Sequence, residues 1–191
     1  MAIAPDTKNW TWVLQRRCPE CGYVATATTR PAVPGLIRHN AAAWEVALRH
    51  RNAGDVRARP REDRWSAAEY GCHVRDVFRI FDQRLMMMLD QDDPVFPNWD
   101  QDATAVADHY EDQDPAVVSG QLTEAAHRIA DRFARLTGPQ WERTGSRSDG
   151  ARFTVDSFAR YLIHDPAHHL HDVGGRQLIH DPVHHLDDVG G

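Results

Sequence analysis

The stretch WSAAEYGCHVRDV, residues 65–77, decides the fold because it marks the start of a long helix. Ser66, followed three residues later by Glu69, is a capping box, and the preceding residue, Trp65, has the position of a hydrophobic staple. The apolar residues that follow keep a helical period for about five turns; they are Tyr70, Val74, Val77, Phe78, Phe81, Leu85 and Met88. This pattern predicts a helix from about residue 66 to residue 90 with one buried face.

Three further segments repeat apolar residues with the same helical spacing. The first begins at Leu36 and is predicted to end before Gly54, and the second begins with Asp114 as its N-cap and stops at a Gly-Pro pair. The last segment starts after Phe153 and leads into a histidine-rich end. No segment alternates with period two for long enough to predict a strand. The sequence therefore predicts an all-α four-helix bundle with a long crossover loop over residues 92–102.

The composition excludes several classes of partner. The chain has 191 residues, 41% of them hydrophobic, and a formal net charge of −6, which fits one domain with some appended sequence. Its basic residues are scattered, so we expect no nucleic-acid partner. No apolar run approaches the roughly 18 residues of a membrane span, and the N-terminal residues lack the plan of a signal peptide. We therefore expect no membrane association and a cytoplasmic location.

The chain divides into three parts. Residues 1–35 carry a C-x-x-C motif and no sustained period, and they are predicted to form an extended arm. Residues 36–175 are predicted to form the bundle, and residues 176–191 a short tail. The tail belongs to a duplication, because LIHDPAHHLHDVGG at 162–175 recurs as LIHDPVHHLDDVGG at 178–191.

The first copy of this duplication is the better candidate for function. It continues the last predicted helix, whereas Gly174 and Gly175 should end that helix before the second copy begins. The second copy, with His180 and His184, keeps three interpretations: a tolerated duplication, a contact with a neighbouring subunit, or a competing metal site of low affinity.

Three histidines are candidate metal ligands. His164 and His168 lie one helical turn apart and point the same way, while His73 lies at the edge of the buried stripe of the helix over 66–90. Three neutral imidazoles from two helices would leave coordination positions open, as a catalytic metal requires. Taken singly, each signal has another interpretation: a structural histidine, or a chance pattern in a histidine-rich segment. Pro166 adds a further choice, between a kinked last turn and a fresh helix capped by the preceding aspartate.

The two histidine-bearing stretches together resemble the DinB-like superfamily of metal-binding four-helix bundles. Its pattern places a histidine after W-[ST]-x-x-E in the second helix and an H-x-x-x-H in the last helix. The matching residues are Trp65, Ser66, Glu69, His73 and Asp76 in the first stretch and His164 and His168 in the second. The resemblance covers about residues 36–173 and implies one site built from the three histidines. It leaves the divalent metal open, with zinc as the first expectation and nickel or iron as alternatives.

The resemblance also implies a type of chemistry. The superfamily includes thiol-dependent S-transferases and a mycothiol-dependent maleylpyruvate isomerase, so it implies a metal-dependent enzyme that activates a low-molecular-weight thiol for a small-molecule substrate. Lys8 is the only lysine among 22 basic residues, a composition typical of GC-rich bacteria, which favours mycothiol as that thiol. A metal-dependent hydrolase and a non-enzymatic, stress-related metal-binding protein are the alternatives. Monomer and homodimer both stay open.

Cys18 and Cys21 form a candidate second metal site. They stand in C-P-E-C-G, the form of half a zinc ribbon, in which Gly22 permits a tight turn. A full tetrahedral site needs two further ligands, and the chain contains no second C-x-x-C. A histidine or a second subunit could complete the site; a redox pair and a reduced turn are the alternatives. The third cysteine, Cys72, points away from His73 and is interpreted as a small buried side chain.

The loop NWDQD, residues 98–102, supplies the candidate catalytic residue. Long loops often carry functional side chains, and Asp100 could act as a general base, bind substrate or hold a metal ligand in place. Asp76 is an alternative base for hydrolysis. Asp102 is expected to cap a short helix predicted over residues 103–109.

Overall fold

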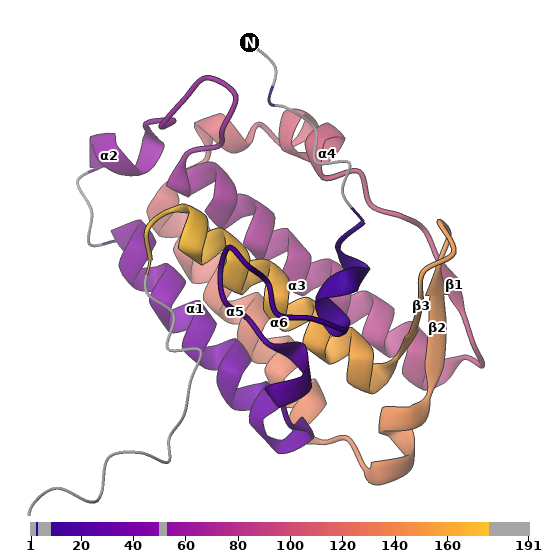
Figure 1. Ribbon diagram of the computed structural model, residues 1–191. Coiled ribbons are helices and arrows are strands. Elements are labelled where there is room, and N and C mark those ends of the chain that lie inside the picture. The colour runs from indigo at the N-terminus through magenta and orange to yellow at the C-terminus, as the bar shows by residue number, and fades with distance from the viewer. Residues whose placement is uncertain (1–2, 4–8, 50–52, 176–191) are drawn as a thin grey trace, which may run out of the picture.

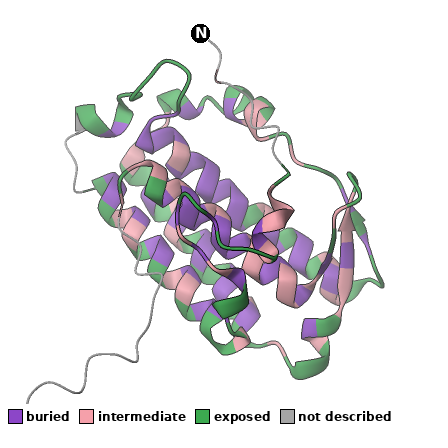
Figure 2. Ribbon diagram, viewed as in Figure 1, coloured by how far each residue is buried: buried purple, intermediate pink, exposed green. Residues whose placement is uncertain are grey.

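Four long helices form the bundle that the sequence predicts (Figure 1). The computed structural model describes residues 3, 9–49 and 53–175. The helices are α1 (Val33–Arg49), α3 (Ala67–Asp90), α5 (Pro115–Ala134) and α6 (Val155–Asp172). Helix α5 packs between α1 and α3, and α6 closes the ring by contacting both of these helices. Their apolar faces meet in one core, where buried residues line the inner sides of the helices (Figure 2).

Helix α3 begins where the capping box predicts. The Glu69 amide donates to Ser66 Oγ at 3.2 Å, and the Ser66 amide donates to Glu69 Oε2 at 2.8 Å. Both halves of the box satisfy amide groups that the first helical turn leaves free. Trp65 packs against Tyr70 and His73, with ring centroids 5.4 and 5.5 Å away. The start of α3 therefore also fixes the position of His73.

Helix α6 is continuous through Pro166, so neither a fresh helix nor a break occurs there. The Pro166 carbonyl accepts a hydrogen bond from Trp44 Nε1 of α1 at 3.1 Å, which holds this turn against the bundle. The helix ends at Asp172, and Gly174 follows with a φ of +71°, a left-handed conformation that glycine adopts readily. The predicted stop is confirmed. The second copy of the duplication, with His180 and His184, lies outside the described residues.

Short elements occupy the crossover between α3 and α5 and the connection into α6. Strand β1 (Val95–Phe96) runs parallel to β2 (Thr144–Arg147), which forms a hairpin with β3 (Arg152–Thr154). Helix α4 (Gln101–Ala107) follows β1. Strands of two to four residues are too short to show an alternating pattern, which is why the sequence does not predict them.

The N-terminal arm folds onto the bundle instead of extending from it. It contains three short 3-10 helices: η1 (Trp10–Leu14), η2 (Ala25–Ala27) and η3 (Arg30–Ala32). Its apolar side chains cause this, because Val13 is fully buried where η1 packs on α6. The Tyr23 hydroxyl also donates to the carbonyl of Arg160 in α6 at 3.0 Å.

The connection between α1 and α3 holds the five-residue helix α2 (Ala53–Arg57). Helix α1 ends before Gly54, as predicted, and α2 includes this glycine. Within residues 3, 9–49 and 53–175, no helix combines the length and the apolar character that a membrane span requires.

Candidate metal centres

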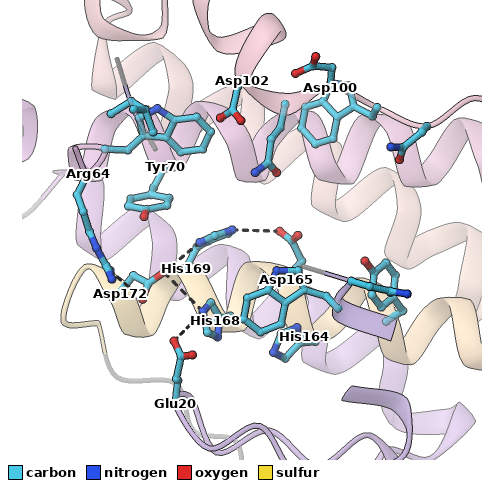
Figure 3. Close-up of a pocket in the computed structure, with 18 of the residues that line it drawn as sticks. Glu20, Arg64, Tyr70, Asp100, Asp102, His164, Asp165, His168, His169 and Asp172 are labelled. Carbon is cyan, nitrogen blue, oxygen red and sulfur yellow. Dashed lines mark hydrogen bonds and ion pairs between the residues drawn. The ribbon is translucent and has the colours of Figure 1, made fainter. Parts of the chain in front are cut away.

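The last turns of α6 present two interleaved pairs of ligands. The segment HDPAHH, residues 164–169, contains His164 and His168 at a spacing of four, and Asp165 and His169 at the same spacing. Adjacent residues differ by about 100° around a helix, so the two pairs face different neighbours. The first pair faces the N-terminal arm and the second faces α3. Figure 3 shows the side chains of both pairs along α6.

The second pair joins His73 of α3 to form what we call the bundle cluster: His73, Asp165 and His169. One ligand atom from each residue lies within 4.8 Å of the others. Oδ1 of Asp165 is 3.3 Å from Nε2 of His73 and 3.8 Å from Nε2 of His169. Ligand atoms at about 2.0–2.2 Å from a tetrahedral ion are separated by roughly 3.3–3.6 Å; the contact with His73 falls in this range and the contact with His169 is slightly longer.

Aromatic rings and a carboxylate hold the two imidazoles of the bundle cluster. The His73 ring stacks on Trp99 with centroids 5.2 Å apart and planes 7° apart. The His169 ring stacks on Tyr70 at 4.8 Å. Nδ1 of His169 lies 3.2 Å from Oδ2 of Asp172 (Figure 3), and this hydrogen bond leaves Nε2 facing Asp165.

Buried polar atoms in the bundle cluster lack hydrogen-bond partners. Both ring nitrogens of His73 and Oδ1 of Asp165 are buried without a hydrogen-bond partner, and Nε2 of His73 lies 3.3 Å from that oxygen as an ion-pair contact. Burial lowers the pKa of His73, although Asp165 opposes the shift. Burial would raise the pKa of Asp165, but the adjacent His73 outweighs it and holds this pKa far below its usual range. A neutral imidazole beside a carboxylate is a donor set that fits a divalent cation.

The bundle cluster opens onto a cavity of about 710 Å³. Asp165 and His169 line the cavity, while His73 is fully buried beside them. Trp65 and Trp99 also line it. Because two of the three candidate ligands line the cavity, an ion held by them would keep coordination positions open to a substrate, the arrangement found in catalytic metal sites.

The other pair of α6 joins the cysteines of the arm in what we call the arm cluster: Cys18, Cys21, His164 and His168. All four residues are buried, and one ligand atom from each lies within 4.8 Å of the others. Sγ of Cys18 is 3.7 Å from Nδ1 of His168. The cysteines of the described chain are free thiols.

Two backbone hydrogen bonds close the turn that carries the cysteines. The Gly22 amide donates to the Cys18 carbonyl at 3.0 Å, and the Cys18 amide donates to the Tyr23 carbonyl at 2.9 Å. Gly22 adopts a φ of +79°, where a side chain would be strained. This turn places Cys18 and Cys21 on one side, toward α6.

Burial alters the acidity of both residue types in the arm cluster. It raises the pKa of the Cys21 thiol to about 12, with the neighbouring Cys18 adding to the shift. Burial also lowers the pKa of His164 to about 4, and it lowers the pKa of His168. The two imidazoles are therefore neutral at physiological pH and keep a lone pair for a metal.

Two acidic side chains lie beside Nε2 of His168. Nε2 of His168 is 3.5 Å from Glu20 and 3.8 Å from Oδ2 of Asp172. The same oxygen of Asp172 contacts His169 of the bundle cluster, and Oδ1 of Asp172 is 3.7 Å from Arg64. Asp172 therefore supports one histidine of each cluster (Figure 3).

Comparisons with known proteins place the chain in a family. The model of the DinB superfamily matches residues 36–173. The chain belongs to the DinB superfamily. Among solved structures it is similar to YfiT from Bacillus subtilis, described as a probable metal-dependent hydrolase with an unusual four-helix bundle topology. The TM-score is 0.68 at 18% identity, over 74% of this chain and 82% of YfiT. No curated protein matches the chain.

The structure distributes the three histidines of the DinB pattern over two clusters. His164 and His168 face the arm and group with Cys18 and Cys21, whereas His73 groups with Asp165 and His169. The metal-binding role of the three histidines stays a prediction. The partners of His73 are the residues that directly follow the predicted pair in sequence. The sequence does indicate this second grouping, because HDPAHH contains two pairs with a spacing of four. The H-x-x-x-H pattern selects only the pair made of two histidines.

The structure places His164 and His168 of α6 beside the cysteine pair. Cys72 is fully buried, and burial raises its pKa to about 12, in agreement with its interpretation as a small buried side chain. Asp76 is held by Arg75 at 2.8 and 2.9 Å and by the Tyr110 hydroxyl at 2.6 Å, so its interactions are structural.

Asp100 occupies the helix-capping position that was expected from the sequence for Asp102. Asp100, not Asp102, caps α4, and its Oδ1 accepts from the Ala103 amide at 2.9 Å. Both carboxylates line the cavity and lie across it from α6 (Figure 3). The catalytic role of Asp100 stays a prediction.

Proposed function

We propose that this DinB-superfamily protein is a metal-dependent enzyme that activates a low-molecular-weight thiol for S-transfer or isomerisation of a small-molecule substrate. One observation carries the proposal: His73, Asp165 and His169 converge, with buried unpartnered atoms, at the edge of a cavity of about 710 Å³. Zinc is the expected ion, with nickel and iron as alternatives, because two imidazoles and one carboxylate suit all three.

The residues around the bundle cluster prepare it for this role. An ion bound there would act as a Lewis acid and lower the pKa of a nucleophile at its open positions. Trp99 fixes the plane of His73, and Asp172 fixes the ring of His169 by accepting from Nδ1. Rings held in this way lose little entropy when they bind a cation.

The cavity wall supports a polar, hydroxyl-bearing thiol such as mycothiol. Charged side chains of both signs line it, including Arg64, Arg147 and Asp102, and they can donate to and accept from hydroxyl groups. The rings of Trp65 and Trp99 offer flat apolar faces between these charges. A mixture of this kind binds sugar-like groups better than a purely apolar ligand.

An assay with monochlorobimane, in the presence and absence of mycothiol, tests the proposal. We expect zinc-loaded protein to accelerate conjugation only when mycothiol is present, and His73→Ala to lower kcat/KM by at least about 100-fold. His109→Ala is the matched control, because His109 is exposed and outside the bundle cluster. Turnover without dependence on the thiol would overturn the thiol proposal, and bound metal without any turnover would favour a non-enzymatic metal-binding protein.

Hydrolysis is the second candidate function, and the donor set favours it. Two histidines and one carboxylate are the ligands of several zinc hydrolases, and YfiT is described as a probable metal-dependent hydrolase. Hydrolysis of nitrophenyl acetate without any thiol, lost in His73→Ala and retained in His109→Ala, would support this function over thiol transfer.

A further inference from the structure

We propose that Cys18, Cys21, His164 and His168 form a second, structural zinc site that fastens the N-terminal arm to helix α6. This site shares no ligand with the bundle cluster. It is therefore independent of the enzymatic activity proposed above.

The donor set is the first argument. Two thiols and two imidazoles are the ligands of a Cys2His2 structural zinc site, which is four-coordinate and tetrahedral. Such a site separates its ligand atoms by roughly 3.3–3.8 Å, given metal distances of about 2.0–2.3 Å. Sγ of Cys18 and Nδ1 of His168 are 3.7 Å apart. Because all four positions would be filled by protein, the site would have no place for a substrate.

The second argument is an unpartnered nitrogen. His164 is 3% exposed, and its Nε2 is buried with no hydrogen-bond partner. An unsatisfied buried donor or acceptor costs about 1–3 kcal/mol, so native structures rarely keep one without a reason. A zinc ion among these four residues would use that nitrogen.

The third argument is the orientation of His168. Its Nε2 faces the carboxylates of Glu20 and Asp172, and its Nδ1 faces Cys18. A metal-bound histidine characteristically has its other ring nitrogen on a carboxylate, which fixes the ring and strengthens its basicity. Glu20 and Asp172 lie beside Nε2 of His168 in this way, at 3.5 and 3.8 Å.

The fourth argument is the packing of aromatic rings against the two histidines of the site. The ring of Trp10 lies over both imidazoles, with centroids 5.4 Å from His164 and 4.8 Å from His168. Tyr23 approaches His164 from the arm at 5.8 Å. Aromatic rings lower the local polarity on their side of the site, although His164 and His168 also line the cavity, and low polarity strengthens the electrostatic attraction between thiolates and a cation.

The consequence would be a metal-mediated cross-link between parts of the chain that are distant in sequence. Cys18 and His168 are separated by 150 residues, so one ion would tie the beginning of the chain to its last described helix. Zinc binding would release the two thiol protons to solvent and restrict the unfolded chain, as other structural zinc sites do.

Cobalt substitution of the full-length protein tests this site. The three tail histidines are first removed by His180→Ala, His184→Ala and His185→Ala, so that the tail cannot contribute metal. We expect the cobalt-loaded protein to show thiolate-to-cobalt charge transfer in the near ultraviolet and strong tetrahedral d–d bands in the visible.

Matched variants then assign the bands. Cys21→Ser should abolish the charge-transfer band and remove one equivalent of tightly held zinc, whereas Cys72→Ser should leave both unchanged. His73→Ala should also leave the charge-transfer band unchanged, even if it abolishes activity. The failure of this proposal and that of the proposed function are thereby distinguishable.

Several outcomes would overturn the proposal. Cobalt spectra without a thiolate band would do so, as would full zinc retention in Cys21→Ser. If Cys21→Ser does not fold, X-ray absorption at the zinc edge of the unsubstituted protein decides: two sulfur scatterers support the site, and their absence contradicts it. Mass spectrometry that finds Cys18 and Cys21 oxidised to a disulfide in freshly purified protein would establish the redox pair instead.

Discussion

The bundle cluster and the arm cluster take two candidate ligands each from the same turns of α6, yet they differ in the number and the chemistry of those ligands. The bundle cluster groups two histidines with one carboxylate, and two of these three residues line the cavity. The arm cluster groups two cysteines with two histidines, all of them buried, and its histidines line the same cavity. An open three-ligand set is typical of catalysis, and a closed four-ligand set with thiolates is typical of structure.

The difference teaches that neighbouring residues on one helix can join different ligand sets. A step of one residue turns a side chain by about 100°, which is enough to group one pair with α3 and the other with the arm. The chemistry of each site is then decided by what the partner segment supplies: His73 from α3 in one case, Cys18 and Cys21 from the arm in the other.

The largest expected effect concerns the closed site. In a His73→Ala background, where the bundle cluster lacks a ligand, we expect Cys18→Ser to lower the free energy of unfolding by about 4 kcal/mol, as the loss of a structural metal does. Urea unfolding followed by circular dichroism measures this, and a strong chelator should reproduce the loss in the His73→Ala protein. Equal midpoints with and without chelator would show that the arm cluster adds no stability.

Removing a charge from the open site should have the next largest effect. Asp165→Asn keeps an oxygen at the bundle cluster but removes the negative charge that attracts the cation. We expect the metal affinity of this cluster to fall by about 100-fold, with the thiolate signal of the arm cluster intact. Isothermal titration with zinc, alongside the cobalt spectrum, measures both sites. A parallel loss of the thiolate signal would mean that the two sites are not separate.

Asp172→Asn should give a smaller effect, and it should be felt at both sites. Asp172 contacts His169 at 3.2 Å and His168 at 3.8 Å. We expect each site to lose about 10-fold in metal affinity, the lower limit for partners of metal-bound histidines. Zinc competition with a chromophoric chelator measures the two affinities, and a change confined to one cluster contradicts the sharing of Asp172.

The smallest effect is expected for Glu20→Gln. Its side chain is 49% exposed and lies 3.5 Å from His168, so solvent screens the interaction and limits it to about 1 kcal/mol or less. The same competition assay should show a weak loss at the arm cluster and none at the bundle cluster. A loss as large as that of Asp172→Asn would require a larger role for Glu20.

Much of the fold follows from local signals in the sequence. The Ser66 and Glu69 capping box and the glycines after Asp172 correctly predict helix ends, because a helix terminus must satisfy its free backbone groups. The folding of the arm over α6 depends on contacts between residues more than 100 positions apart, such as Tyr23 with Arg160. Periodicity carries no information on such contacts.

The candidate site was only partly predictable for a related reason. Histidine spacing pointed to α6 and His73, where the structure groups residues that could hold a metal ion. Spacing does not state which face of α6 meets α3, and that orientation depends on packing such as the hydrogen bond from Trp44 to Pro166. Asp165 escaped prediction because the family pattern searches for histidine at this step, whereas a carboxylate can serve the same cation.

The interleaving of the two pairs in HDPAHH also limits how this segment can change by insertion or deletion. In sequence, the arm and the bundle look like separable modules. The arm nevertheless meets its candidate ligands within the same six residues that supply the bundle cluster. An insertion or deletion in this turn would displace both pairs together, whereas substitution of a single ligand would change one cluster alone.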